Sequence, residues 1–114
     1  MSGLIVDGLD LLAEIIEGTG HTVVTDSNGI RPGVIVIDPP TLQVKNADLY
    51  ELQFPVWSLA RPPADGRAER AMLDMADDVI RVVPATAGGA PGIYSTGNQE
   101  IPGFRVTVVM TVQR

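Results

Sequence analysis

Two long segments with alternating side chains constrain the fold of this chain more than any other feature. In one, about residues 49–59, Tyr50, Leu52, Phe54 and Val56 share one face, and Leu49, Glu51, Gln53 and Trp57 share the other. In the other, residues 104–113, Phe104, Val106, Val108, Met110 and Val112 point one way, and Arg105, Thr107, Thr111 and Gln113 point the other. Successive side chains of a strand point to opposite faces. Both segments are therefore predicted strands with one apolar face that a second layer must cover.

Two segments have the apolar periodicity of helices that can form this layer. The first carries a stripe of Ile5, Leu9, Leu12 and Ile16, widened by Leu11 and Ile15, with Asp10, Glu14 and Glu17 towards solvent. The second carries a stripe of Met72, Leu73, Ala76, Val79, Ile80 and Val83. Asp65 can cap the second helix, because its carboxylate can accept from an early backbone N–H. Gly18 and Gly20 end the first helix, and Pro84 ends the second.

Shorter signals lie between these elements. Residues 21–40 predict two strands joined by a turn at residues 26–29, Asp-Ser-Asn-Gly. Pro39-Pro40 ends the second of these strands. Pro55 has no N–H to donate to a neighbouring strand. We therefore expect the strand of residues 49–59 to lie at a sheet edge or to bulge at this proline.

Residues 84–103, PATAGGAPGIYSTGNQEIPG, are unlike the rest of the chain. Strand-like residues follow the glycines, and no lysine occurs beyond Lys45, so a phosphate-binding loop is not supported. Loops of this length inside a compact domain are usually functional or mobile. We interpret the stretch as an extended hairpin arm whose tip, near Gly88–Gly92, is flexible until a neighbouring subunit orders it.

The order of elements predicts a single domain over residues 1–114. Its class is α+β: a mainly antiparallel four- to five-stranded sheet with two helices packed on one face, plus the Gly/Pro-rich arm of residues 84–103.

Composition and charge exclude several kinds of function. The chain has no cysteine, which excludes disulfides, zinc–thiolate sites and cysteine nucleophiles. Its net charge of −6, with a single lysine, argues against tight binding to nucleic-acid phosphates. The apolar N-terminal run is interrupted by acidic residues and follows no Lys or Arg. We therefore expect a cytosolic product with no targeting segment and no membrane partner.

Few residues in the sequence suggest chemistry. His21 is the only histidine, and we interpret it as a polar loop residue. Asp38 would suit an acid–base site if it had a partner carboxylate, although a turn aspartate explains it better. Asp74, Asp77 and Asp78 lie on adjacent helical turns, where carboxylates can hold a divalent cation. A solvated helix face explains these three better.

Two serines and one tryptophan complete the candidates. Ser58 and Ser95 lack the setting of a serine nucleophile. Trp57 is either a contact residue for a partner or a side chain packed under a loop. The sequence therefore predicts a protein that is not an enzyme, with no catalytic, metal-binding or cofactor-binding residue.

Four segments taken together suggest a family. They are an opening amphipathic helix, LDLLAEIIEG; a central strand, ADLYELQFPVWSLARPP; a second helix, DGRAERAMLDMADDVIRVV; and a closing segment, GIYSTGNQEIPGFRVTVVMTVQR, in which IPGF leads into the last strand. In this order the chain resembles the tail terminator (tail-completion) proteins of long, non-contractile-tailed bacteriophages. The likeness covers nearly the whole chain as a pattern of elements.

The resemblance implies a structural virion protein at the head-proximal end of the tail, made in the host cytoplasm. Six copies would form a ring that caps the tail tube protein, stops tail polymerisation and docks head-completion or connector proteins. DNA would pass through without specific binding, because six copies at −6 each carry −36. Candidate contacts with a neighbouring subunit or the tail tube are Pro55, Trp57, Gly88, Gly89, Pro91, Ile93 and Tyr94. Candidate acidic lumen residues are Asp38, Asp48, Glu51, Asp74 and Asp78.

Two alternatives stay open at the level of sequence. One is another head–tail joining component, such as a head-closure or connector protein, which would share the virion and the ring but touch different partners. The other is a cellular α+β module that binds a peptide or a small molecule.

Overall fold

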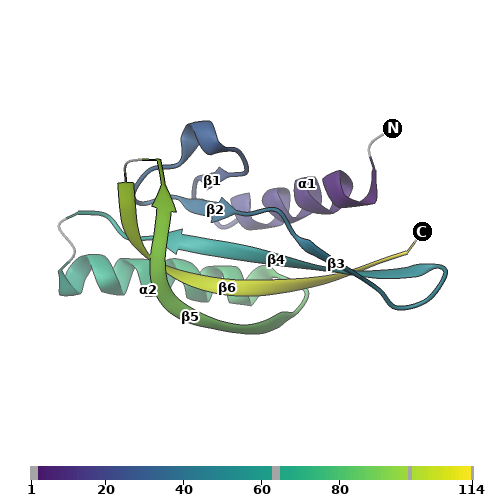
Figure 1. Cartoon of the computed structure of the whole chain (residues 1–114). Coiled ribbons are helices and arrows are strands. Elements are labelled where there is room, and N and C mark those ends of the chain that lie inside the picture. Colours follow the sequence, from purple (N-terminus) through teal and green to yellow (C-terminus); the bar gives the residue numbers. More distant parts are fainter. Residues whose placement is uncertain (1–2, 63–64, 98, 114) are drawn as a thin grey trace.

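The computed structural model describes residues 3–62, 65–97 and 99–113, and it places two helices on one face of a mostly antiparallel sheet (Figure 1). The helices are α1 (Leu4–Glu17) and α2 (Gly66–Val82). In the described residues the strands are β1 (Val23–Val24), β2 (Ile35–Ile37), β3 (Thr41–Val44), β4 (Leu49–Leu59), β5 (Thr86–Thr96) and β6 (Gln99–Gln113). Their order is β1-β2-β4-β6-β5, and β3 also pairs with β4. The predicted α+β class is confirmed, with six strands where four or five were expected.

The main core lies between the helices and the sheet. β4 and β6 alternate between buried and more exposed side chains, as their sequences predict. Fully burying an apolar side chain of this size stabilises a fold by roughly 1.5–3 kcal/mol, so this layer is the chief source of stability. Its buried members are Leu12 and Ile16 of α1; Met75, Ala76 and Val79 of α2; Ile35 and Ile37 of β2; Leu52, Phe54 and Val56 of β4; and Val106, Val108 and Met110 of β6.

Each helix turns a slightly different face to the sheet than its periodicity predicts. On α1, Ile5 and Leu11 are 43% and 50% exposed, although the predicted stripe includes both. On α2, Leu73 and Ile80 are exposed, and Met75 is buried instead. Both helices carry apolar residues around more than one side. Periodicity alone therefore does not decide which of these residues meet the sheet.

Pro55 does not lie in an edge strand, and β4 keeps an unbroken register with β6 through it, so neither the edge position nor the bulge of β4 expected at this proline is observed. β4 is a central strand, paired with β6 along its whole length. On the other side of β4, β2 pairs with Val56–Ser58 and β3 pairs with Tyr50–Gln53. The N–H of Asp38 donates to the carbonyl of Pro55 at 2.9 Å. Pro55 therefore lies where β2 has ended and β3 has not begun, a place where a missing N–H removes no bond of the sheet.

β1 and β2 run parallel and do not form a hairpin. The predicted turn chemistry is present, because the Asp26 carboxylate accepts from the N–H of Asn28 at 2.9 Å and caps a short 3-10 helix, η1 (Ser27–Gly29). Residues 25–34 separate the two strands. That connection is too long for a tight hairpin loop. It lets the chain run back along β1 before β2 begins, so that β2 runs in the same direction as β1.

A second, smaller apolar cluster lies on the sheet face turned away from the helices. Val36 directly follows the core residue Ile35 in β2, and Leu59 lies three residues after the core residue Val56 in β4. Because side chains alternate along a strand, both point to the face opposite the main core. This end of the sheet is therefore apolar on both faces, which accounts for the continuous VIVI run at residues 34–37. The buried members are Val24, Val34, Val36, Leu59 and Ile101, with Ile30, Trp57 and Tyr94 packed against them.

Candidate functional site

The contact residues predicted from the sequence lie on β5 and on the sheet beside it. Gly88, Gly89, Pro91, Ile93 and Tyr94 are on β5, and Pro55 and Trp57 are on β4, two strands further in. β5 is the last strand of the sheet, and within the described residues it pairs only with β6. Most of β5 is exposed, and residues 84–99 include no charged side chain. Natural edge strands are protected by charges, prolines or bulges. β5 has no charge, but it has Pro91 and a register shift between Thr86 and Gly89, so the part open to pairing with another chain lies after Pro91.

The hydrogen bonds of the sheet decide which backbone groups of β5 are free. The N–H of Val109 donates to the carbonyl of Ala85 at 2.9 Å, so odd-numbered residues of β6 turn their backbone groups towards β5. Gly103 is one of these residues, and it lies opposite Gly92. Gly92 therefore faces β6.

The residues on either side of Gly92 face outward in consequence. Alternation directs the backbone groups of Pro91, Ile93 and Ser95 away from the sheet. Pro91 lies where its missing N–H removes no bond to β6. The outer edge thus presents the N–H and carbonyl groups of Ile93 and Ser95, beside an Ile93 side chain that is 55% exposed.

Gly88 and Gly89 form a bulge in β5 and not the tip of an arm. The pairing register shifts between Thr86 and Gly89, and Gly88 has φ of +106°, a conformation that favours glycine. A Cβ on Gly89 would lie 2.7 Å from the carbonyl oxygen of Arg105. The predicted hairpin tip therefore does not lie in this stretch, which pairs with β6. The chain reverses instead near Gly97.

Trp57 lies half-buried on the sheet face turned away from the helices. Two glycines lie against its ring. A Cβ added to Gly92 would lie 3.3 Å from the ring, and a Cβ added to Gly103 would lie 3.1 Å from it. Tyr94 meets the ring edge-on, with 5.4 Å between centroids, and the guanidinium carbon of Arg105 lies 6.0 Å from its centroid. Trp57 therefore packs within its own subunit, against strands and not under a loop. A contact with a partner remains a prediction.

Tyr94 joins this aromatic cluster to Asp38. Its hydroxyl donates to Oδ1 of Asp38 at 2.9 Å. Burial, and then the hydrogen bond and the negative charge of Asp38, raise the pKa of Tyr94 to about 12. The two side chains border a hollow of about 260 Å³ that Asp26 also lines. Because the Asp26 carboxylate caps η1, the hollow holds two aspartates that each already have a structural partner.

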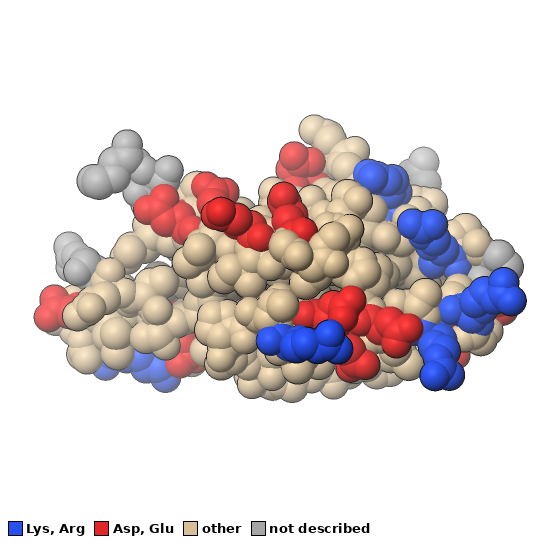
Figure 2. All heavy atoms as spheres, turned by 180° about the vertical axis from the view of Figure 1, so that it is seen from behind, with Lys and Arg blue, Asp and Glu red and all other residues tan. Residues whose placement is uncertain are grey.

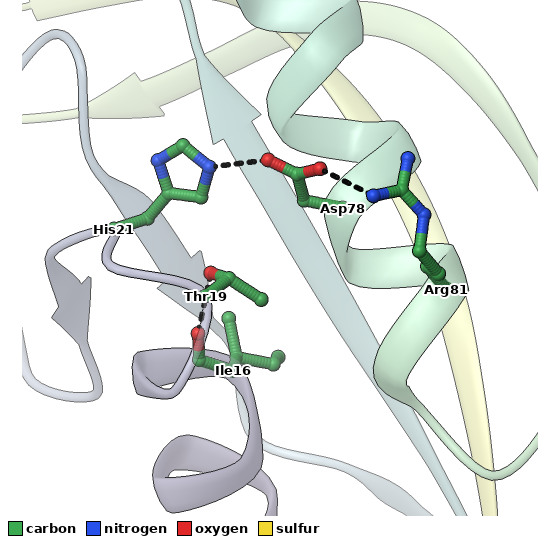
Figure 3. A network of polar contacts seen from close by, with 5 residues as sticks. All are labelled: Ile16, Thr19, His21, Asp78 and Arg81. Atoms are coloured by element: carbon green, nitrogen blue, oxygen red, sulfur yellow. Dashed lines mark hydrogen bonds and ion pairs between the residues drawn. The ribbon is translucent and has the colours of Figure 1, made fainter.

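His21 links the segment after α1 to α2 (Figure 3). Its Nε2 lies 2.8 Å from Oδ2 of Asp78, and the other carboxylate oxygen of Asp78 lies 3.5 Å from a guanidinium nitrogen of Arg81. The hydroxyl of Thr19 donates to the carbonyl of Ile16 at 2.6 Å, where α1 ends. Only the His21–Asp78 contact joins two parts of the chain, the segment after α1 and α2. His21 is therefore a polar loop residue, as expected, with Asp78 as its partner.

The five predicted lumen residues do not gather on one surface. Asp38 and Glu51 lie on the sheet side away from the helices, and Asp48 lies in the turn between β3 and β4. Glu51 is 3.3 Å from Nζ of Lys45 and accepts from the Gln53 amide. That hydrogen bond, with the help of Lys45, lowers the pKa of Glu51. The other two residues, Asp74 and Asp78, lie on α2, in the helix layer on the opposite side of the sheet.

Acidic side chains gather over the helix layer, which Figure 2 shows from behind. On α1 they are Asp7, Asp10, Glu14 and Glu17, and on α2 they are Asp74, Asp77 and Asp78. The sequence places the α1 acids towards solvent, but it does not show that they join those of α2 in one surface. The spacing of the α1 acids is the sequence signal from which an acidic surface could be predicted, because it puts all of them on one side of the helix.

No protein-family model and no curated protein matches this chain. Within the described ranges, no three His, Asp or Glu side chains are grouped so that they could hold a metal ion. Neither described helix is long and apolar enough to cross a membrane. The open β5 edge and the charged helix layer are therefore the features from which a function can be inferred.

Proposed function

We propose that this protein is a ring-forming structural subunit that terminates the tail of a long, non-contractile-tailed bacteriophage. The observation that carries the proposal is the outer edge of β5, which is long, exposed and free of charge. A terminator needs a surface that stays open in the free subunit and closes on assembly. An uncharged strand edge has this property beyond Pro91, where Ile93 and Ser95 offer backbone hydrogen bonds to an incoming chain.

In the proposed assembly the β5 edge contacts the end of the tail tube. Ile93 and Ser95 offer outward backbone donors and acceptors, and the exposed Ile93 side chain offers apolar contact. Pro91 blocks one donor position, which limits the registers in which a strand can add. Capping the tube in this way removes the surface to which the next tube subunit would bind.

We place the acidic part of α2 towards the lumen of the ring. Asp74, a predicted lumen residue, is exposed there with Asp77. Asp78, also a predicted lumen residue, is half-buried and pairs with His21 and Arg81, so it adds little to the wall. A negative wall repels DNA phosphates and lets the genome pass without adhering. Asp38 and Glu51 are not part of this wall, because they lie on the other side of the sheet.

Native mass spectrometry and negative-stain microscopy of the purified protein test the ring. We expect ring-shaped particles of six copies. A protein that stays strictly monomeric at the highest attainable concentration would contradict the proposal. Co-expression with the products of neighbouring genes tests the role: capture of tail tube subunits supports a terminator, and capture of portal-side proteins alone supports a head-closure protein instead.

The variant Ile93→Lys tests the edge itself. A charge there protects the edge and should lower capture of tail tube subunits on the order of tenfold, while ring formation is kept. Leu73→Lys is the matched control, because it makes the same chemical change at an exposed position of α2. Equal loss of capture in both variants would contradict a specific role for β5.

A further inference from the structure

The outward face of α1 combines acidic and apolar side chains in a way that the fold of one copy does not explain. Asp7, Asp10, Leu11 and Glu14 follow the i, i+3, i+4, i+7 spacing of a single helical stripe. Leu11, in the middle of the stripe, is 50% exposed. Within the described residues the three acids have no ion-pair partner, and α1 has no basic residue. We name these four residues the α1 docking face.

Apolar surface continues from this face to the end of the sheet. Ile5 and Val6, in the first turns of α1, are both exposed. With Leu42 and Tyr50 they line an apolar hollow of about 360 Å³. An apolar area rimmed by charge is typical of a protein–protein interface.

Basic side chains gather mainly at one end of the helix layer, as Figure 2 shows. Arg67 and Arg70 lie near the start of α2, and Arg61 packs against Gly33, two residues after Arg31. Within the described residues none of these arginines has an ion-pair partner, whereas Arg81 does. We name Arg31, Arg61, Arg67 and Arg70 the arginine end.

The position of these charges on α2 is unfavourable for a single copy. The N-terminus of a helix carries partial positive charge, so a cation in the first turn is disfavoured there. Arg67 lies in that turn. Acids also lie nearby: Asp65 caps α2, Glu69 is in its first turn, and Asp74 and Glu100 each line a hollow that Arg61 also lines. Within the described residues none of these acids forms an ion pair with the four arginines, so an acidic partner from another copy can pair with them.

We infer that the α1 docking face of one copy binds the arginine end of a second copy, so that the ring is built head to tail. The inference rests on the proposed function and names the contact that closes the ring. The two surfaces are opposite in charge, and they lie towards opposite ends of a molecule whose longest dimension is 48 Å (Figure 1). Two different patches that bind each other give a heterologous contact, and such contacts generate rings when the rotation closes.

Two charge-reversed variants test this contact. Asp10→Arg with Glu14→Arg makes the α1 docking face positive like the arginine end. Arg67→Glu with Arg70→Glu makes the start of α2 negative, together with Asp65 and Glu69, like the α1 docking face. Each variant alone should assemble at least about tenfold more weakly than the unaltered protein, because like charges then meet across the contact. An equimolar mixture should regain assembly, since each variant now complements the other. Native mass spectrometry should show rings with equal numbers of the two variants.

Asp48→Arg with Asp77→Arg is the matched control for Asp10→Arg with Glu14→Arg, since it raises the net charge by the same amount and alters neither contact surface. Because Asp77 lies in the proposed lumen wall, only assembly is measured on this control. It should assemble like the unaltered protein. Circular dichroism shows whether each variant is folded. Asp10→Asn with Glu14→Gln should weaken assembly less than charge reversal and make it less sensitive to salt.

The outcomes separate the inference from the proposed function. If each reversed variant forms rings alone, or if folded variants fail to assemble when mixed, the head-to-tail contact is wrong and the terminator proposal stands. If the unaltered protein never assembles, the proposed function itself is contradicted.

Discussion

At the scale of single residues, Tyr94 makes the most specific polar contact on the sheet face that carries Trp57. Its pKa is raised from 10.0 to about 12 by burial and by Asp38. A raised tyrosine pKa means that the fold favours the protonated form. The stabilisation is therefore complete below a pH of about 10, and it is lost as the pH rises towards about 12.

Ultraviolet titration of tyrosinate checks this expectation. The chain has two tyrosines, and we expect a phase with a midpoint of about 12 that disappears in Tyr94→Phe. Asp38→Asn should lower that midpoint, because it removes the negative charge that opposes ionisation. A phase with a midpoint of about 12 that persists in Tyr94→Phe would contradict the assignment.

Gly103 leaves room for the Trp57 ring beside it. A Cβ there would come within 3.0 Å of Leu59, 3.1 Å of the Ser58 carbonyl oxygen and 3.1 Å of the Trp57 ring. We expect Gly103→Ala to lower the free energy of unfolding by about 1–3 kcal/mol, because an added methyl overpacks the site. Urea denaturation followed by tryptophan fluorescence measures the loss. Gly66→Ala is the control, because a Cβ there meets open space, and it should have little effect.

At the scale of elements, the sequence predicts best those segments whose two faces differ most. β4 runs from Leu49 to Leu59 as expected, because apolar and polar side chains alternate along most of it. α2 begins after Asp65, whose carboxylate accepts from the N–H of Ala68 at 2.9 Å. In both cases the information is local, since neighbouring residues set the period or the cap.

The elements that the sequence misses depend on partners far along the chain. β5 has no alternating pattern through Gly88 and Gly89, and its extended form comes from pairing with β6. The parallel direction of β1 and β2 is likewise set by long-range packing. At the candidate site, the role of Ile93 and Tyr94 as contact residues stays a prediction. The sequence assigns Leu11 to the core, although it is exposed, because α1 is apolar on several sides.

Removing the N-terminal cap of α2 tests whether Asp65 stabilises the start of this helix. Asp65→Ala should lower the free energy of unfolding by about 1 kcal/mol, because one N–H at the helix start loses its acceptor. Asp77→Ala, at an exposed position further along α2, should change stability by less than about 0.5 kcal/mol. Both values come from urea denaturation followed by circular dichroism. Equal effects in the two variants would show that the cap contributes nothing specific.

At the scale of the whole molecule, charge is distributed so that a single copy repels itself while two copies attract. The acids of α1 and α2 lie close together on the helix layer, and the net charge is −6. Self-repulsion of this kind lowers the stability of a folded chain. Asp78 of α2 already lies 3.5 Å from Arg81 within one copy, whereas the acids of the α1 docking face would meet arginines only in a neighbouring copy. The charges of α1 therefore oppose folding of the single chain and favour assembly.

Salt should therefore act on stability and on assembly with opposite signs. Raising the salt concentration screens repulsion between the acids of the helix layer, and it should stabilise the dissociated Arg67→Glu, Arg70→Glu variant by about 1 kcal/mol. In the unaltered protein the same salt should weaken assembly, because it screens the attraction between the α1 docking face and the arginine end. Urea denaturation of the variant and native mass spectrometry of the unaltered protein, both over one salt series, measure the two trends. Trends of the same sign would mean that the acids of α1 are not held against a cationic partner, and the contact that closes the ring would then have to be apolar.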